Sequence, residues 1–169
     1  MKNQILSERV NLFEPNVYIQ FLVQIEGSVS PEALKNAVEK AYTVNEATMS
    51  KIVLEENGEA YYEKMKKSGC KAIIREGDFQ EIIRENEKLP FVIKRGELMR
   101  VFIIPAKDHI ALLLMAHHLA GDGKSMVYFL LDVMNILIGK EVKEKPMKLV
   151  TKESFPQKSP LYLTSNIDK

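Results

Sequence analysis

The stretch that decides the fold runs from His109 to Gly139, HIALLLMAHHLAGDGKSMVYFLLDVMNILIG. Its apolar run, residues 110–116, has the length and composition of a buried strand. The run ends in two adjacent histidines, His117 and His118, and a turn with two glycines follows. Residues 124–138 then carry apolar side chains at helical spacing. The sequence therefore predicts a strand, a tight turn and a helix, which together hold the histidines rigidly.

Both histidines are candidates for proton transfer, because an imidazole with a pKa of about 6.5 can accept a proton at neutral pH. Alternation along the strand sends His117 and His118 to opposite sides, so only one can face a given cleft. Gly121 and Gly123 favour a sharp turn, and Asp122 supplies a negative charge or an acceptor at the helix start. The resulting pattern is His-His-x-x-x-Asp-Gly.

A second motif overlaps the first. From His118 onward the residues resemble a phosphate-binding loop, GxxxxGK[ST], with His118 in place of the first glycine. That glycine lets the loop curl around phosphate, and no second strand shows a clear magnesium-binding aspartate, so we do not favour nucleotide hydrolysis. A simpler anion contact at the helix start, made by Lys124, Ser125 and the local amides, remains a hypothesis.

Periodicity predicts the other elements. The expected segments are strand 17–26; helix 31–44, capped by Ser30; hairpin strands 49–55 and 60–65 around a type I′ turn at Asn57-Gly58; strand 70–75; helix 79–89, with an Asp78–Glu81 capping box; and paired strands 98–105 and 110–116. This order predicts an α+β fold, a two-layer sandwich in which helices pack on a mixed, mostly antiparallel sheet.

Composition fits one ordinary domain. The chain has 169 residues, 46% of them hydrophobic, and a net charge of +1, which gives no basic field for nucleic acid. Its single cysteine, Cys70, excludes an internal disulfide and a cysteine-based metal site, and we interpret it as a small core residue. We expect no metal. Without a leader-like segment or a long apolar run, a cytoplasmic protein with no membrane contact is the default.

The character of the chain changes after Gly139. Residues 140–169 carry three prolines and many lysines without a sustained period. This composition is typical of a linker or of a strap laid over a surface. We therefore divide the chain into a lobe, residues 1–139, and a linker or strap, residues 140–169.

The HHxxxDG pattern resembles the signature of the chloramphenicol acetyltransferase-like superfamily, which includes nonribosomal peptide condensation domains, alcohol O-acetyltransferases, plant BAHD acyltransferases and carnitine acyltransferases. The order of elements, the segment Gly-Glu-Leu-Met-Arg that ends at Arg100, and the Asn57-Gly58 hairpin extend the resemblance over about residues 5–140. The chain is thus similar to the N-terminal lobe of these enzymes.

The resemblance implies transfer of an acyl group from a thioester of coenzyme A or carrier-protein phosphopantetheine to a hydroxyl or amine. It implies that His118 is the general base and that no covalent enzyme intermediate forms. His117 is then a packing or orienting residue, and Asp122 is mainly structural and pairs with Arg100, unless it simply caps the last helix. Gly123 keeps a channel open beside the base. No permanently bound cofactor is implied.

Length is the departure from the family, whose enzymes bind substrates in a tunnel between two lobes of similar size. We favour the explanation that the chain is one lobe of a longer, stand-alone acyltransferase and is inactive in isolation. It can also be a single lobe that dimerises or pairs with another polypeptide. The third hypothesis is a non-catalytic module that binds a carrier protein or partner subunit, in which His118 has no catalytic task.

Overall fold

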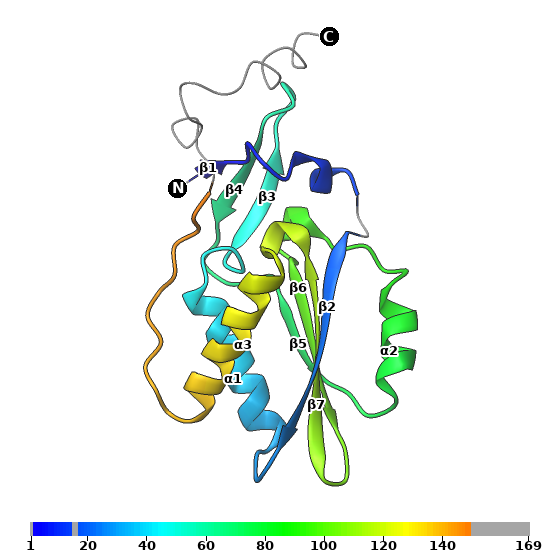
Figure 1. The fold of residues 1–169 in the computed structure, drawn as a ribbon. Coiled ribbons are helices and arrows are strands. Elements are labelled where there is room, and N and C mark those ends of the chain that lie inside the picture. Colours follow the sequence, from blue (N-terminus) through cyan, green and yellow to red (C-terminus); the bar gives the residue numbers. More distant parts are fainter. Residues whose placement is uncertain (1, 15–16, 150–169) are drawn as a thin grey trace, which may run out of the picture.

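The computed structural model describes residues 2–14 and 17–149 (Figure 1). Two sheets form within this part of the chain, a central one in the order β2-β7-β6-β5 and a smaller one in the order β1-β4-β3. The strands are β1 (Lys2–Gln4), β2 (Tyr18–Glu26), β3 (Ser50–Leu54), β4 (Ala60–Lys64), β5 (Lys71–Ile74), β6 (Met99–Pro105) and β7 (His109–His117). The helices are α1 (Pro31–Val44), α2 (Phe79–Asn86) and α3 (Gly123–Leu137), with 3-10 turns η1 (Arg9–Leu12), η2 (Ile93–Arg95) and η3 (His118–Ala120).

Strand β7 lies inside the central sheet, antiparallel to both of its neighbours, β2 and β6. The β5–β6 pair is parallel, so the sheet is mixed. Residues 110–117 are all buried, which explains why this strand reads as a continuous apolar run rather than an alternating one. The α+β class and the mixed, mostly antiparallel sheet are confirmed.

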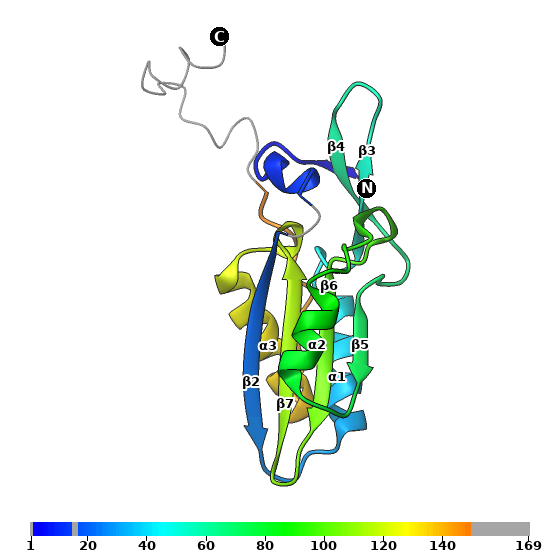
Figure 2. The ribbon, with the colours of Figure 1, turned by 90° about the vertical axis from the view of Figure 1, so that its right-hand side faces the viewer.

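Helices cover the two faces of the central sheet unequally (Figures 1 and 2). Helices α1 and α3 pack on one face, where the core includes Leu112, Leu114 and Ala116 of β7. Helix α2 covers the other face, where Leu113 and Met115 meet Ile82. Alternate side chains of β7 therefore pack into two separate hydrophobic cores. The α2 layer and the small sheet were not part of the predicted two-layer sandwich.

The hairpin turn between β3 and β4 differs from the prediction. Gly58 has φ of 83°, but Asn57 does not adopt a positive φ, so the expected type I′ turn is wrong. The Gly58 amide donates to the Glu55 carbonyl at 3.0 Å, and the Glu55 amide donates to the Glu59 carbonyl at 2.8 Å. These bonds define a longer loop in which one glycine in the left-handed region is enough.

The predicted helix starts are confirmed with one difference. Ser30 accepts a hydrogen bond from the Ala33 amide at 3.1 Å, ahead of Pro31. Asp78 caps α2 by accepting from the Gln80 amide at 3.1 Å, rather than from the Glu81 amide that a capping box uses.

The chain returns along α1 and α3 after the last helix (Figure 1). The Lys145 amide donates to the Val44 carbonyl at 2.7 Å, and the Glu46 amide donates to the Lys145 carbonyl at 3.1 Å. The ammonium of Lys145 also pairs with the buried carboxylate of Asp132 on α3. Of the predicted linker or strap, residues 150–169 lie outside the described residues.

Candidate active site at the end of strand β7

The motif occupies the strand, turn and helix start that the sequence predicts. Strand β7 ends at His117, η3 follows, and α3 begins at Gly123. Asp122 is the N-cap of α3, and its Oδ1 accepts from the Ser125 amide at 2.8 Å and from the Ser125 hydroxyl at 2.6 Å. These two hydrogen bonds lower the pKa of Asp122, so it stays a carboxylate.

His117 is fully buried on the α2 face of the sheet. Its Nδ1 accepts a hydrogen bond from the Leu119 amide at 3.1 Å. Because an amide can only donate, Nδ1 is unprotonated and the neutral ring carries its proton on Nε2. Burial lowers the pKa of His117, although the Glu14 backbone opposes that shift. Nε2 has no hydrogen-bond partner of acceptable geometry among the described residues.

His118 differs from its neighbour. It is half-buried, and its side chain makes no hydrogen bond to any residue of the described part of the chain. Its backbone amide donates to the Val17 carbonyl at 3.1 Å, which fixes the start of the turn against the segment leading into β2. Among the described residues, neither ring nitrogen of His118 has a hydrogen-bond partner.

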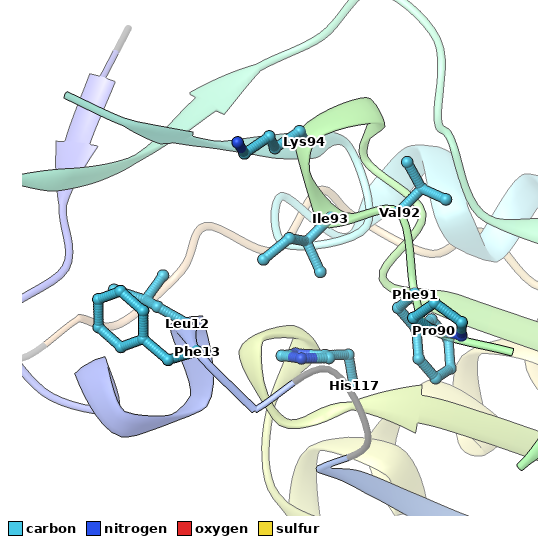
Figure 3. Close-up of a pocket in the computed structure, with 8 residues that line it drawn as sticks. All are labelled: Leu12, Phe13, Pro90, Phe91, Val92, Ile93, Lys94 and His117. Carbon is cyan, nitrogen blue, oxygen red and sulfur yellow. The ribbon is translucent and has the colours of Figure 1, made fainter. Parts of the chain in front are cut away.

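An open apolar hollow of about 470 Å³ lies above His117 (Figure 3). Its walls come from the η1 region and from the segment that follows α2, and His117 lies between them. His118 is not among the residues that line this hollow, which are Leu12, Phe13, Pro90, Phe91, Val92, Ile93, Lys94 and His117. The structure thus places the two histidines in different surroundings.

The expected pairing of Arg100 with Asp122 is not formed. Arg100 Nε instead donates to Glu97 Oε1 at 2.7 Å, and both side chains are buried. Arg100 lies on the same face of β6 as Phe102, which packs in the core beneath α2. Asp122 is exposed at the start of α3, and α3 packs on the opposite face. The sheet separates the two side chains.

The two glycines of the turn have unequal roles. Gly121 has φ of 139°, and a Cβ there would lie 2.6 Å from the Ser125 Cβ. Gly123 has no positive φ, and a Cβ there would meet only the Phe21 ring, at 3.9 Å. The expectation that both glycines are needed for the sharp turn is therefore wrong for Gly123, which begins the helix.

Three other residues from the sequence analysis have defined surroundings. Both donors of Ser125, its amide and its hydroxyl, are used by Asp122, and the Lys124 ammonium lies 5.8 Å from the centre of the Tyr128 ring. An anion at the start of α3 would therefore find fewer free hydrogen-bond donors than the sequence of the phosphate-loop-like motif suggests. Burial raises the pKa of Cys70 to about 11, which makes it a poor nucleophile.

Sequence reasoning missed Phe91 and Glu97. The Phe91 ring lies 5.8 Å from the His117 ring, at an interplanar angle of 72°. Glu97 accepts from Arg100 and from the Lys71 ammonium, the latter at 2.8 Å. The spacing of Glu97 and Arg100 was visible in the sequence, but nothing there marked them as buried together.

Among the described residues no group of His, Cys, Asp and Glu can hold a metal ion.

Several solved structures share this fold, and condensation domains are among them. The condensation domain from the monacolin K polyketide synthase MokA has a TM-score of 0.74 at 12% identity, over 86% of this chain and 36% of that chain. SgcC5 from Streptomyces globisporus has a TM-score of 0.61 at 23% identity, over 78% and 33%. A variant of the starter condensation domain of rhizomide synthetase RzmA, in complex with C8-CoA, has a TM-score of 0.68 at 12% identity, over 86% and 38%.

No protein-family model and no curated protein matches the chain. The structural likenesses show that the chain shares the fold of condensation domains. The chain spans only 36% of the length of MokA's condensation domain and 33% of SgcC5. No helix of the described residues is long and apolar enough to cross a membrane.

Proposed function

We propose that the chain is the N-terminal lobe of an acyltransferase or condensation enzyme in which His118 is the general base. The observation that carries this proposal is the hydrogen bond from the Leu119 amide to Nδ1 of His117. It occupies the one basic nitrogen of His117 and leaves His118 as the motif imidazole that can accept a proton. The fold shared with condensation domains supports the same role.

The chemistry follows from a neutral imidazole beside an acyl thioester. A nitrogen of His118 accepts the proton of a hydroxyl or amine while that group forms a bond to the thioester carbonyl carbon. The tetrahedral intermediate then collapses, the carbon–sulfur bond breaks, and the leaving thiolate takes the proton from the imidazolium. His118 returns to its neutral form without a covalent bond to the substrate. A positioned base typically accelerates such a step roughly 10²- to 10⁴-fold.

The proposed donor is an acyl thioester of coenzyme A or of phosphopantetheine on a carrier protein. Two solved structures with this fold support the choice, since the RzmA variant holds C8-CoA and the enacyloxin polyketide synthase uses a condensation domain for chain release. The rest of the substrate tunnel comes from a second lobe, a partner subunit or a second copy of the chain.

The alternative is a non-catalytic lobe that serves as a binding or dimerisation module for a carrier protein or partner subunit. One observation favours it. Helix α3 carries three large apolar side chains, Val127, Tyr128 and Leu131, that are about half exposed. Their spacing places them on one side of the helix, as in an interface.

The test is His118→Ala in the natural protein that contains this chain, assayed by thiol release from acyl-CoA and acyl-phosphopantetheine donors. We expect turnover to be lost and the unfolding transition to be unchanged. His109→Ala is the matched control, because His109 lies at the far end of β7 beside Asp108. Unchanged turnover in His118→Ala contradicts the proposal. Binding of a carrier protein without turnover, retained in His118→Ala, supports the alternative.

A further inference from the structure

The segment that leaves α2 is held by one buried guanidinium. Arg100 is 4% exposed, and its two terminal nitrogens donate to the carbonyls of Leu89 and Pro90, at 3.0 and 2.8 Å. Its Nε donates to Glu97, which also accepts from the Val92 amide at 3.4 Å. The planar fork of arginine thus fixes both ends of the short segment around Phe91, which the single ammonium of lysine cannot do.

The same guanidinium contacts the Phe91 ring, with Cζ 4.3 Å from the ring centre. Phe91 in turn packs edge-on against the His117 ring. Register explains the closeness, because Arg100 pairs with Met115, and His117 lies two residues further along β7 on the same face. Arg100, Phe91 and His117 therefore form a continuous contact chain across one face of the sheet.

The contact chain ends at the turn that carries the proposed base. The His117 ring holds the Leu119 amide, and His118 lies between these two residues. A rotation of the His117 ring breaks this hydrogen bond and removes one of the bonds that hold the turn. The ring has no other hydrogen bond of acceptable geometry in the described part of the chain, so its packing, which includes the edge-on contact with Phe91, restrains it.

We propose that Arg100 is a positioning residue, which holds Phe91 against His117 and thereby fixes the turn from which His118 acts. The geometric part of this inference is independent of the reaction, whereas its effect on turnover rests on the proposed function. The pair of buried charges by itself is weak support for stability, because replacing such pairs with apolar residues is often neutral. Fixing the geometry of the segment is the more specific consequence.

The test uses NMR on the full chain, which has only three histidines and hence three sets of imidazole signals. Arg100→Lys keeps a cation beside Glu97 but lacks the planar fork whose separate nitrogens reach Glu97 and both carbonyls at once. We expect the His117 ring signals to shift and hydrogen exchange at the Leu119 amide to become several-fold faster, while His109 stays unchanged. Phe91→Leu, which leaves the buried charges intact, is expected to produce the same change at Leu119 and covers the case in which Arg100→Lys fails to fold.

Two controls separate positioning from general destabilisation. Arg75→Lys alters an exposed arginine that also forms two hydrogen bonds to a carboxylate, and it is expected to leave His117 unchanged. Val133→Ala weakens the core on the opposite face. Wild-type signals at His117 and Leu119 in Arg100→Lys, or equal changes in Val133→Ala, overturn the inference. The proposed function fails separately, if His118→Ala retains turnover.

Discussion

The Leu119 amide donates to Nδ1 of His117 at 3.1 Å, so the first histidine of the motif stabilises the turn that presents the second. This bond fixes the tautomer of His117 and removes its basic nitrogen from chemistry. His117 is fully buried, whereas His118 is half-buried. The two adjacent imidazoles therefore lie in different surroundings for a structural reason, which is the alternation of side chains at the end of a buried strand.

Buried, neutral His117 should make stability depend on pH. Burial lowers its pKa in the folded state, whereas the unfolded chain has the ordinary histidine pKa of about 6.5. As the pH falls through that value, the unfolded state takes up the proton first, so stability is complete above about pH 7 and decreases below it. Urea unfolding at pH 7.5 and 5.5 checks this dependence.

His117→Asn is the variant for that measurement, because the Asn oxygen can still accept from the Leu119 amide but does not titrate. We expect its stability to change less than that of the wild type between the two pH values. His109→Asn is the control and should behave like the wild type. An equal loss in His117→Asn and the wild type would show that another group titrates.

Gly121 and Gly123 should respond in opposite ways to alanine. Gly121→Ala forces a Cβ into a left-handed conformation and against Ser125, and it should destabilise the fold by about 1–3 kcal/mol. Gly123→Ala has open space and should change the free energy of unfolding by less than about 1 kcal/mol. If Gly123→Ala loses turnover while it stays folded, a channel beside His118 explains the loss. A large loss of stability in Gly123→Ala would contradict the geometry.

Asp122 should act through folding rather than through chemistry. Asp122→Ala removes the N-cap acceptor of α3 and is expected to cost about 0.5–2 kcal/mol of stability. Asp122→Asn keeps an acceptor, so stability and turnover should both stay close to wild type. Thermal unfolding and thiol release measured on the two variants check this. Loss of turnover in a fully folded Asp122→Asn would assign a catalytic part to the carboxylate.

Local patterns predicted most of the elements, because each depends on neighbours in the sequence. Helix α1 begins at Pro31 and ends at Val44 as expected, since its cap and its apolar stripe are both local. The hairpin itself was predicted, but its turn type was wrong, because that type depends on how β3 and β4 pair across Glu55 and Glu59. Local residues alone do not fix that register.

The candidate site was predictable only in part. The motif correctly predicted that β7 ends at the histidines, and the alternation of side chains correctly predicted that His117 and His118 lie in different surroundings. The predicted partner of Arg100, Asp122, was wrong. Alternation along a strand tells which side chains share a face, but it does not tell which helix covers that face. The contact of Phe91 with His117 joins segments far apart in the chain, and no local pattern contains it.

The segment after α3 offers the last prediction, because one ion pair attaches it. Asp132 is buried on α3, and its carboxylate accepts from Lys145 and, at 3.3 Å, from the side-chain nitrogen Nδ2 of Asn45. Lys145→Met leaves the side chain of Asn45 as the remaining partner of that carboxylate and should lower the free energy of unfolding by about 1–2 kcal/mol. The loss is smaller than for a fully buried ion pair, because Lys145 is half exposed.

A second substitution identifies the cause. Asp132→Asn removes the orphaned charge, so the double variant Asp132→Asn with Lys145→Met should be more stable than Lys145→Met alone. Lys140→Met is the matched control, because Lys140 is exposed and forms no ion pair within the described residues. Urea unfolding is measured on Lys145→Met, Asp132→Asn, the double variant and Lys140→Met. If Lys145→Met unfolds like Lys140→Met, the backbone bonds at Val44 and Glu46 hold this segment without the charge.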